Sequence, residues 1–221
     1  MQLSNETLAI LKNFASINQG IEFKAGNVLR TVSTGKTILA QAELVDSFPE
    51  EFCVYDLNQF LSVHGLFKDS PVLDYDESNV IFKVGTRKVK YRKTAKGMVV
   101  TPPEKNLMAA SVDFGFTLDA ADYDWIMKSA NVLSSPNVAL VSDGEEVLLV
   151  AMDVTDDSAH TNSIRVADGD GRKFKIVYKT ENIKMIPGSY VAEVTFGKFT
   201  HFKNTQHKLE YWIALEKESE F

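Results

Sequence analysis

The apolar residues near the start of the chain recur at the spacing of an α-helix. When Thr7–Ile17 is projected at about 100° per residue, apolar side chains gather on one face: Leu8, Ile10, Leu11, Phe14, Ala15 and Ile17. The opposite face is polar or small: Asn5, Ala9, Lys12, Asn13 and Ser16. This pattern predicts an amphipathic helix with one buried and one solvated side.

A second helix pattern, Ala121–Leu133, begins roughly 115 residues later, and similar strand patterns follow both helices. Its apolar face consists of Tyr123, Ile126, Met127, Ala130 and Leu133, with Trp125, Lys128 and Val132 opposite. Each half then reaches a strand that ends in tyrosine, Phe52–Tyr55 in the first and Phe174–Tyr178 in the second. Repetition over so long a period indicates two similar domains, as in one segment of a symmetric assembly.

Alternating apolar and polar runs between turn residues predict antiparallel hairpins. The runs are Ile21–Lys24 and Val28–Val32; Val72–Tyr75, Val80–Val84 and Arg87–Arg92; and Asn137–Ser142 and Glu146–Ala151. Two further strand patterns, Gly188–Phe196 and Leu209–Leu215, lie near the end of the chain. Antiparallel sheets with a few helices define an α+β fold class.

The stretch between the two halves has the composition of a linker. It contains Gly97, the consecutive prolines Pro102 and Pro103, and the small residues Ala109–Ser111. Prolines lack amide donors and favour an extended chain. We therefore expect a domain over 1–98, a connector over 99–112 and a second domain over 113–221.

Composition narrows the class of protein. The chain has 221 residues, of which 44% are hydrophobic, an ordinary value for soluble globular proteins. No apolar run reaches the roughly 18 residues that a membrane span needs, and the first residues lack the pattern of a signal peptide. The single cysteine, Cys53, excludes an internal disulfide and lies in a strand pattern. A buried cysteine and a cytosolic location are therefore expected, with a reactive thiol as the alternative.

Charge is unevenly distributed along the chain. The formal net charge is −6, yet the run from Arg87 to Lys96 is rich in Arg and Lys and contains no acid. Acidic residues cluster elsewhere, for example at Asp74–Glu77 and in the last residues of the chain. Such a distribution can attract a polyanion to one surface of an acidic protein. The alternative is an ordinary solvated surface with one basic strand.

Motifs that suggest nucleotide or metal binding lack residues that these functions require. Gly35-Lys36-Thr37 lacks the earlier glycine of a phosphate-binding loop, since position 30 is Arg30, and strand patterns flank it. Asp168–Gly171 resembles the start of a calcium loop, but Lys179 occupies the position of the bidentate glutamate. The histidines have neither the spacing nor the cysteine partners of a metal site. We therefore expect no enzyme activity, no cofactor and no metal, and a turn at each of these two motifs.

Several segments together are similar to one family, the sliding clamps (DNA polymerase processivity factors) of T-even-type bacteriophages. The specific ones are Ile10–Gly20 (ILKNFASINQG) and Tyr55–Leu61 (YDLNQFL). Met185–Tyr190 (MIPGSY) and the closing run Tyr211–Phe221 match more loosely. Length and order agree over the whole chain.

The resemblance implies a DNA-clamp fold and a homotrimeric, head-to-tail ring. Two similar domains per chain would place helices around a central hole and antiparallel sheets on the outside. The ring would encircle duplex DNA without sequence specificity and tether the replicative DNA polymerase. An ATP-dependent clamp loader would place it on DNA in the cytoplasm of the infected bacterial host. The family also supports late transcription, so late-transcription factors are further expected partners; no membrane is involved.

Two sets of site residues follow from the resemblance. The first set, expected to face DNA, comprises basic residues: Lys12, Lys128, Lys68, Lys179, Lys184 and Arg92. The second set, expected to form an apolar groove for partner peptides, comprises Val99, Val100, Leu107, Met108, Trp212 and Phe221. Solvation competes with the first role. Core packing competes with the second role for Trp212, and a flexible tail competes with it for Phe221.

Two other classes of protein remain open from the sequence. One is a structural assembly protein built from duplicated β-rich domains. The other is a direct single-stranded DNA-binding protein that uses Arg87–Lys96, with Tyr91 stacking on bases between the cations.

Overall fold

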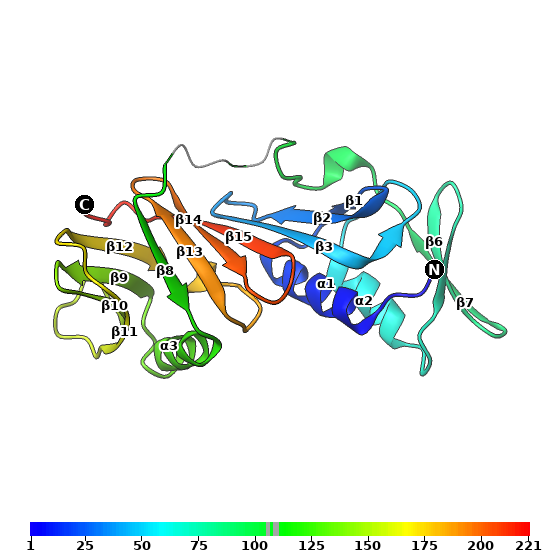
Figure 1. The fold of residues 1–221 in the computed structure, drawn as a ribbon. Helices are drawn as coiled ribbons and strands as arrows, with labels where there is room; N and C mark the ends of the chain where they lie inside the picture. Colours follow the sequence, from blue (N-terminus) through cyan, green and yellow to red (C-terminus); the bar gives the residue numbers. More distant parts are fainter. Residues whose placement is uncertain (105–106, 108–110) are drawn as a thin grey trace. The chain divides into compact units, whose positions relative to one another are not determined.

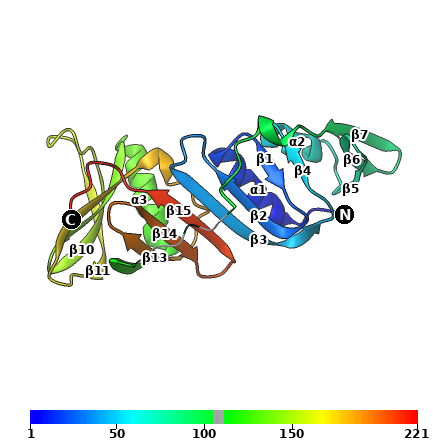
Figure 2. The ribbon, with the colours of Figure 1, turned by 90° about the horizontal axis from the view of Figure 1, so that it is seen from above.

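The chain forms two compact units, Met1–Lys105 and Asn106–Phe221, which we call unit 1 and unit 2. The computed structural model describes residues 1–104, 107 and 111–221. Both units combine antiparallel strands with few helices (Figures 1 and 2), so the predicted α+β class is confirmed.

Helix α1 (Asn5–Ile17) of unit 1 occupies the predicted segment. Ser4 caps it: its hydroxyl accepts a hydrogen bond from the amide of Thr7 at 3.1 Å. The predicted apolar face is the buried face of the helix, except at two positions. Thr7, which was not assigned to that face, is fully buried, whereas Leu8, which was, is half-buried. The Ser4 hydroxyl donates to the Thr7 hydroxyl at 3.2 Å, which satisfies this polar group away from water.

The described residues of unit 1 form seven strands: β1 (Ile21–Phe23), β2 (Gly26–Val32), β3 (Ile38–Phe48), β4 (Phe52–Val54), β5 (Val72–Tyr75), β6 (Asn79–Val84) and β7 (Arg87–Arg92). The predicted hairpins β5–β6 and β6–β7 are confirmed. The hairpin expected around Gly26 is wrong, since β1 pairs with β4 and β2 pairs with β3. Gly26 has a φ of 108° and adjoins an irregularity in the register, so the chain turns away from β1 there.

Helix α2 (Leu57–Gly65) packs against α1 in unit 1, and its Phe60 is fully buried. The Phe60 ring lies 5.9 Å from the ring of Phe23, 5.0 Å from that of Phe82 and 5.4 Å from that of Tyr91. Aromatic rings at these separations stabilise a core beyond their buried area. The helix thus closes an aromatic core.

Unit 2 begins with β8 (Phe114–Leu118) and α3 (Ala120–Val132), the second predicted helix. One sheet has the order β11-β10-β9-β12, with β9 (Asn137–Asp143), β10 (Glu146–Met152), β11 (Asn162–Asp168) and β12 (Lys173–Lys179). Further strands of the unit are β13 (Tyr190–Thr195), β14 (Phe199–Asn204) and β15 (Leu209–Ala214). Antiparallel pairs join β15 to β14, β14 to β13 and β13 to β8. The predicted β9–β10 hairpin is confirmed.

A short 3₁₀ turn, η2 (Thr180–Asn182), follows β12 at the position where unit 1 has α2. The next loop is held by tyrosine hydroxyl groups. Tyr123 donates to the carbonyl of Met185 at 2.8 Å, and Tyr190 donates to the carbonyl of Ile186 at 2.5 Å. The hydroxyl of Tyr211 accepts from the amide of Ile186 at 3.2 Å. Burial raises the pKa of Tyr190 to about 12, so its hydroxyl remains a proton donor at neutral pH.

The chain between the units is fastened to unit 1 over its first part. A 3₁₀ turn, η1 (Lys96–Met98), precedes it. The side-chain amide of Asn18 donates to the carbonyl of Val100 at 3.0 Å, and the Arg30 guanidinium donates to the carbonyl of Pro103 at 2.8 Å. In unit 2, Thr195 donates to the carbonyl of Ser111 at 2.9 Å. The expected connector 99–112 therefore begins on the surface of unit 1.

Candidate functional site

The solvated face of α1 presents Lys12 near a second predicted cation. Lys12 is exposed, and within the described residues it has no ion-pair partner. Lys68 lies just beyond α2 and lines a hollow of about 550 Å³ together with His64. Burial, and then the charge of Lys12, lower the pKa of His64. Lys12 thus disfavours the charged form of the His64 imidazole, and Lys68 lies in the same hollow as that imidazole.

The corresponding helix of unit 2 carries a different charge arrangement. Lys128 on α3 is exposed, but it forms an ion pair with Asp124 one turn earlier. Exposed pairs of this spacing contribute about 0.3–0.5 kcal/mol, yet the neighbouring carboxylate offsets the charge that Lys128 presents. Trp125 is 55% exposed on the same helix. The solvated face of α3 is therefore nearly neutral and partly apolar, whereas Lys12 has no paired acid among the residues described.

The remaining predicted DNA-facing cations lie outside the helices. Lys179 ends β12 and is 3.9 Å from a carboxylate oxygen of Glu216. It lines a pocket of about 940 Å³ that also includes Met127 and Asn131 of α3. Lys184 is half-buried in the loop after η2, and Arg92 is exposed at the end of β7. Lys179 therefore lies near α3, whereas Arg92 lies at the end of a strand.

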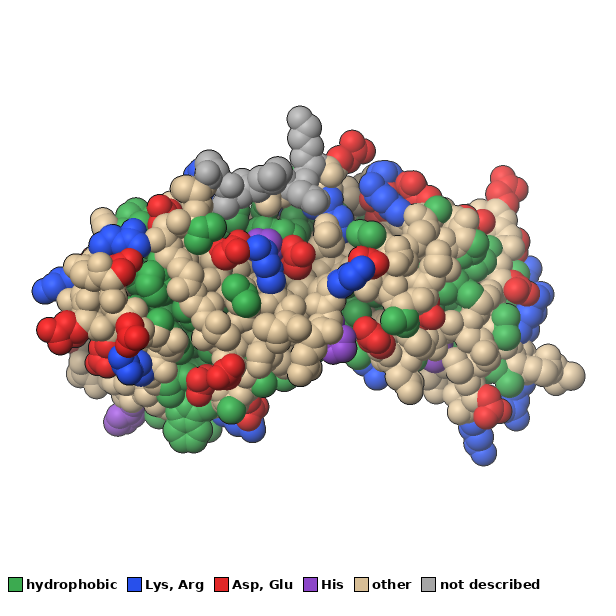
Figure 3. Space-filling view, in the orientation of Figure 1, with side chains coloured by type: hydrophobic (Ala, Val, Ile, Leu, Met, Phe, Trp, Pro, Cys, Tyr) green, Lys and Arg blue, Asp and Glu red, His purple; other side chains and the backbone are tan. Residues whose placement is uncertain are grey.

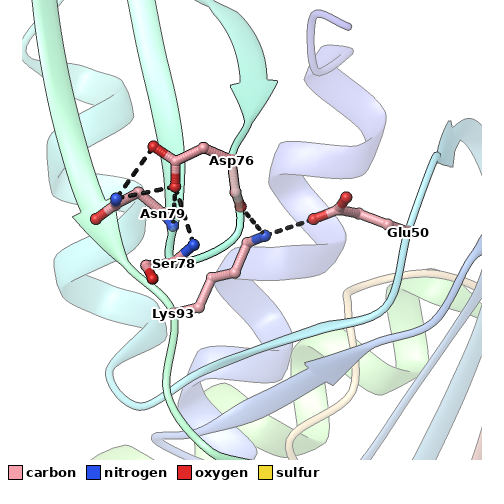
Figure 4. A network of polar contacts seen from close by, with 5 residues as sticks. All are labelled: Glu50, Asp76, Ser78, Asn79 and Lys93. Carbon is pink, nitrogen blue, oxygen red and sulfur yellow. Dashed lines mark hydrogen bonds and ion pairs between the residues drawn. The ribbon is translucent and has the colours of Figure 1, made fainter.

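The basic segment is only partly available to solvent. Tyr91 is 9% exposed and donates to the carbonyl of Asp56 at 2.9 Å. Lys93 bridges the Glu50 carboxylate and the Asp76 carbonyl, both at 2.5 Å (Figure 4). The stacking role proposed for Tyr91 in a single-stranded DNA-binding protein is wrong, because its ring is packed in the core. The cations of β7 remain exposed: Arg87, Lys88, Lys90 and Arg92.

The predicted partner residues of the connector occupy different environments. Val99 packs against the backbone of unit 1 beside Gly20, where an added Cβ would lie 2.8 Å from a Val99 methyl group. Val100 is 38% exposed and Leu107 is 40% exposed. Met108 lies outside the described residues. Of the predicted connector residues that the structure describes, Val100 and Leu107 are therefore the ones with exposed side chains.

The two predicted partner residues of unit 2, Trp212 and Phe221, also differ in exposure. Trp212 on β15 is 5% exposed and stacks on His201, with ring centroids 4.3 Å apart. Phe221 is 60% exposed and stacks on Phe196, with centroids 5.1 Å apart and an interplanar angle of 9°. Trp212 is thus a packed residue of unit 2. Phe221 lies on the surface and packs against Phe196.

A row of charged side chains on β13, β14 and β15 was not predicted from the sequence. His201 is within 2.8 Å of Glu210, and Lys203 is within 2.7 Å of Glu193. Acidic and basic side chains alternate over this sheet face in Figure 3. Burial lowers the pKa of His201, against the opposing effect of Glu210. Cross-strand register brings these residues together, and register is invisible in sequence spacing.

The motifs that the sequence excluded as phosphate-binding or calcium-binding loops form turns in the structure. Gly35-Lys36-Thr37 lies in the turn between β2 and β3, and Asp168–Gly171 joins β11 to β12, as predicted. Cys53 is buried, and burial raises the pKa of its thiol. Among the described residues, no group of His, Cys, Asp and Glu is arranged to hold a metal ion. In that same part of the chain, no helix combines the length and apolar character needed to cross a membrane.

Comparison with known proteins connects this architecture to replication. Residues 4–100 match the family model described as DNA polymerase processivity factor. The sliding clamp of Vibrio phage KVP40 is 32% identical over 222 residues, covering 98% of this chain and 99% of that protein. The sliding clamp of Escherichia phage RB69 is 28% identical over 224 residues, covering 99% and 98%.

Solved structures share the fold at low identity. An A. fulgidus PCNA, solved with the C-terminal region of FEN-1, has a TM-score of 0.69 at 15% identity and covers 96% of both chains. An H. pylori beta clamp has a TM-score of 0.71 at 13% identity, covering 98% of this chain and 65% of that one. The predicted clamp fold is thus confirmed. The chain belongs to the sliding clamps of T-even-type phages, which are non-enzymatic DNA polymerase processivity factors.

Proposed function

We propose that this clamp works as a homotrimeric ring that encircles duplex DNA and holds the replicative polymerase on it. Family membership supports the role of processivity factor. A ring needs no strong grip on DNA, because topology prevents escape while it slides. The weakly charged helices α1 and α3 suit such loose contact, since strong phosphate binding would slow sliding.

The single observation that carries the ring is a pair of strand edges. β7 ends its three-stranded sheet in unit 1, and β11 ends its four-stranded sheet in unit 2. An edge strand presents amide and carbonyl groups that can pair with another chain. Pairing β7 of one copy with β11 of the next is a head-to-tail contact, which closes into a ring when the rotation per subunit permits.

Charge favours this pairing over pairing between like edges. β7 exposes Arg87, Lys88, Lys90 and Arg92. Acidic residues flank β11 on both sides: Asp156 and Asp157 before it, Asp168 and Asp170 at and after its end. Asp168 and Asp170 are paired with Arg165 and Arg172, so Asp156 and Asp157 carry the negative charge that is left unpaired among the described residues. Two β7 edges would repel each other, whereas β7 and β11 attract.

Solution mass tests the ring. Light scattering should detect a species near 74 kDa, three times 24.7 kDa, that dissociates on dilution. The double variant Lys88→Glu/Lys90→Glu should weaken assembly about tenfold, because it places acids opposite acids. Lys217→Glu is the matched control, since the Lys217 side chain is 90% exposed and lies in the C-terminal tail. A chain that stays monomeric at high concentration would sink the proposal.

In the ring, the DNA-facing role falls first to Lys12 and Lys128, and then to Lys68, Lys179, Lys184 and Arg92. The double variant Lys12→Glu/Lys128→Glu should assemble normally yet load or slide poorly. Unchanged loading and processivity would remove both residues from this role. An ATP-dependent clamp loader would open the ring, and late-transcription factors are further proposed partners, in the cytoplasm of the infected host.

The partner groove is proposed beside the connector 99–112, between proposed domains 1–98 and 113–221. Its accessible candidates among the described residues are Val100 and Leu107, whereas Val99 and Trp212 are each packed within their own unit. Leu107→Ser should lower the affinity of a polymerase-derived peptide, whereas Val45→Ser, at an exposed valine elsewhere in unit 1, should not.

A further inference from the structure

The strands β5, β6 and β7 form a sheet of their own in unit 1. No hydrogen-bonded ladder among the described strands joins this sheet to β1–β4, so its angle to the rest of the unit depends on other contacts. One of these is the packing of Phe82 and Tyr91 against Phe60 of α2. Burial of apolar surface is non-directional. This packing therefore holds the sheet against α2 but does not by itself fix its angle.

Lys93, directly after β7, supplies directional bonds. Its ammonium group donates to the Glu50 carboxylate and to the Asp76 carbonyl, both at 2.5 Å (Figure 4). Glu50 lies between β3 and β4, whereas Asp76 lies in the turn between β5 and β6. The Lys93 side chain is 13% exposed, so water competes weakly for these bonds. One ammonium group thus connects the three-stranded sheet to the β3–β4 turn, a contact that we call the Lys93 bridge.

The turn at Asp76 is braced on its own side. The Asp76 carboxylate accepts hydrogen bonds from the amides of Ser78 and Asn79 at 3.0 and 2.7 Å. The side-chain amide of Asn79 donates to the same carboxylate at 2.9 Å, and the amide of Lys93 donates to the carbonyl of Ser78 at 2.9 Å. Because these bonds brace the turn, the Lys93 bridge constrains the whole sheet rather than a single loop.

The chain beyond Lys93 continues the attachment. The amide of Thr94 donates to the carbonyl of Cys53 on β4 at 2.9 Å. The ammonium group of Lys96 lies 2.5 Å from the carboxylate of Glu22 on β1, which is 8% exposed. A carboxylate so buried needs a partner of opposite charge. These bonds tie the segment that follows β7 to both β1 and β4.

We propose that Lys93 is a positioning residue for ring assembly: through Glu50 it fixes the angle at which the β7 edge meets the next subunit. This role rests on the proposed pairing of β7 with β11. Strand pairing needs amide and carbonyl groups aligned along the whole edge. A sheet that tilts on α2 holds this alignment for only part of the time, and the apparent affinity falls by that fraction. The Lys93 bridge thus orders the edge before assembly rather than during it.

Two single variants test this role through the dissociation constant of assembly, measured by analytical ultracentrifugation. Lys93→Met and Glu50→Ala should each raise that constant at least tenfold. Glu50→Ala separates positioning from net charge, because removing an acid from the unit that bears the basic β7 edge would by charge alone strengthen pairing with an acidic strand. The Glu50 side chain is 43% exposed, so this variant should fold even if Lys93→Met does not.

Asp74→Ala is the matched control. Asp74 accepts a hydrogen bond of the same length, 2.5 Å, from Lys83, but both residues lie inside the three-stranded sheet. This variant should not weaken assembly. The double variant Lys93→Met/Glu50→Ala should assemble no worse than Lys93→Met, because both changes remove the same bridge.

A second measurement reads the angle of the sheet in the single chain. Dyes would be attached to Ala9→Cys on α1 and Thr86→Cys in the β6–β7 turn, both at exposed positions, while the native cysteine is buried. Energy transfer would be recorded on single molecules, at dilutions where rings dissociate. The distribution of transfer efficiency should broaden in Lys93→Met and Glu50→Ala but not in Asp74→Ala. Circular dichroism should show that these variants remain folded.

Either of two results would overturn the role of Lys93. One is assembly of Glu50→Ala that is as strong as that of the unchanged chain, or stronger. The other is an unchanged distribution of transfer efficiency in folded Lys93→Met. An unchanged chain that stays monomeric would refute the ring itself, and with it this role; its mass distinguishes that outcome from the other two.

Discussion

Units 1 and 2 share a similar order of elements, but they form different structures directly after their tyrosine-ended strand segments. After its tyrosine-ended strand segment, unit 1 forms the helix α2, whose Phe60 closes an aromatic core. Unit 2 forms only the 3₁₀ turn η2 and a loop that Tyr123, Tyr190 and Tyr211 hold by their hydroxyl groups. Duplicated sequence patterns thus reach similar folds by apolar packing in one unit and by buried hydrogen bonds in the other.

Removing the ring of Phe60 from the aromatic core of unit 1 should have the largest effect on stability. Phe60→Ala should lower the free energy of unfolding by about 3–5 kcal/mol, because it deletes a fully buried ring. Both tryptophans, Trp125 and Trp212, lie in unit 2. The unfolding midpoint by circular dichroism should therefore fall further than the midpoint by tryptophan fluorescence. Equal falls would contradict separate cores, and exposed Val45→Ala is the control.

Removing one hydroxyl from the loop of unit 2 should have a smaller effect. Tyr123→Phe deletes a buried donor and leaves the carbonyl of Met185 unpaired, at a cost of about 1–2 kcal/mol. Urea unfolding followed by tryptophan fluorescence measures it. Tyr55→Phe is the matched control, because Tyr55 is 54% exposed. A loss no larger than that of the control would show that packing alone holds this loop.

The two helices that carry Lys12 and Lys128 should respond oppositely to single charge changes. Asp124→Asn frees Lys128 from its paired acid, whereas Lys12→Gln removes the exposed cation of α1. Adding or removing one interaction with a DNA phosphate changes the dependence on salt by about threefold between 50 and 200 mM. The loss of DNA affinity between 50 and 200 mM salt should therefore become about threefold larger in Asp124→Asn and about threefold smaller in Lys12→Gln. Shifts in the same direction would refute the comparison.

The histidines of the two units should differ in acid sensitivity. Burial lowers the pKa of both His64 and His201, so in each case the unfolded chain binds the proton more readily. This contribution to stability is therefore fully present above the unfolded histidine pKa and is lost as the pH falls from that value through the lowered folded pKa. Lys12 adds to this effect at His64, whereas Glu210 opposes it at His201. His64→Gln should thus protect against unfolding below about pH 6.5 more than His201→Gln does.

Helix and hairpin positions were predictable because the apolar pattern itself determines them. α1, α3 and the hairpins β5–β6, β6–β7 and β9–β10 follow from local periodicity and turn residues. The pairing of β1 with β4 did not follow, since contacts distant in sequence leave no local pattern. Strand β11 was also missed, because none of its residues is buried: half-buried and exposed positions alternate, so it lacks a strongly apolar face.

The candidate site was less predictable for a similar reason. Lys12 and Lys128 sit on solvated helix faces, as the helical projection indicates. The ion pair of Lys128 with Asp124 has the spacing i, i+4 and could have been predicted from the sequence. The packing of Phe221 on Phe196 could not, because only the fold brings Phe221 back to the turn after β13.

Retention on DNA of different topology tests the central claim most directly. The clamp would be loaded by the proposed ATP-dependent loader onto nicked circular DNA and purified by gel filtration. Half of the sample would then be cut with a restriction enzyme. The account predicts that the clamp stays on the circle and slides off the linear product. Equal retention on both forms would contradict it, because direct binding rather than encirclement would then hold the protein on DNA.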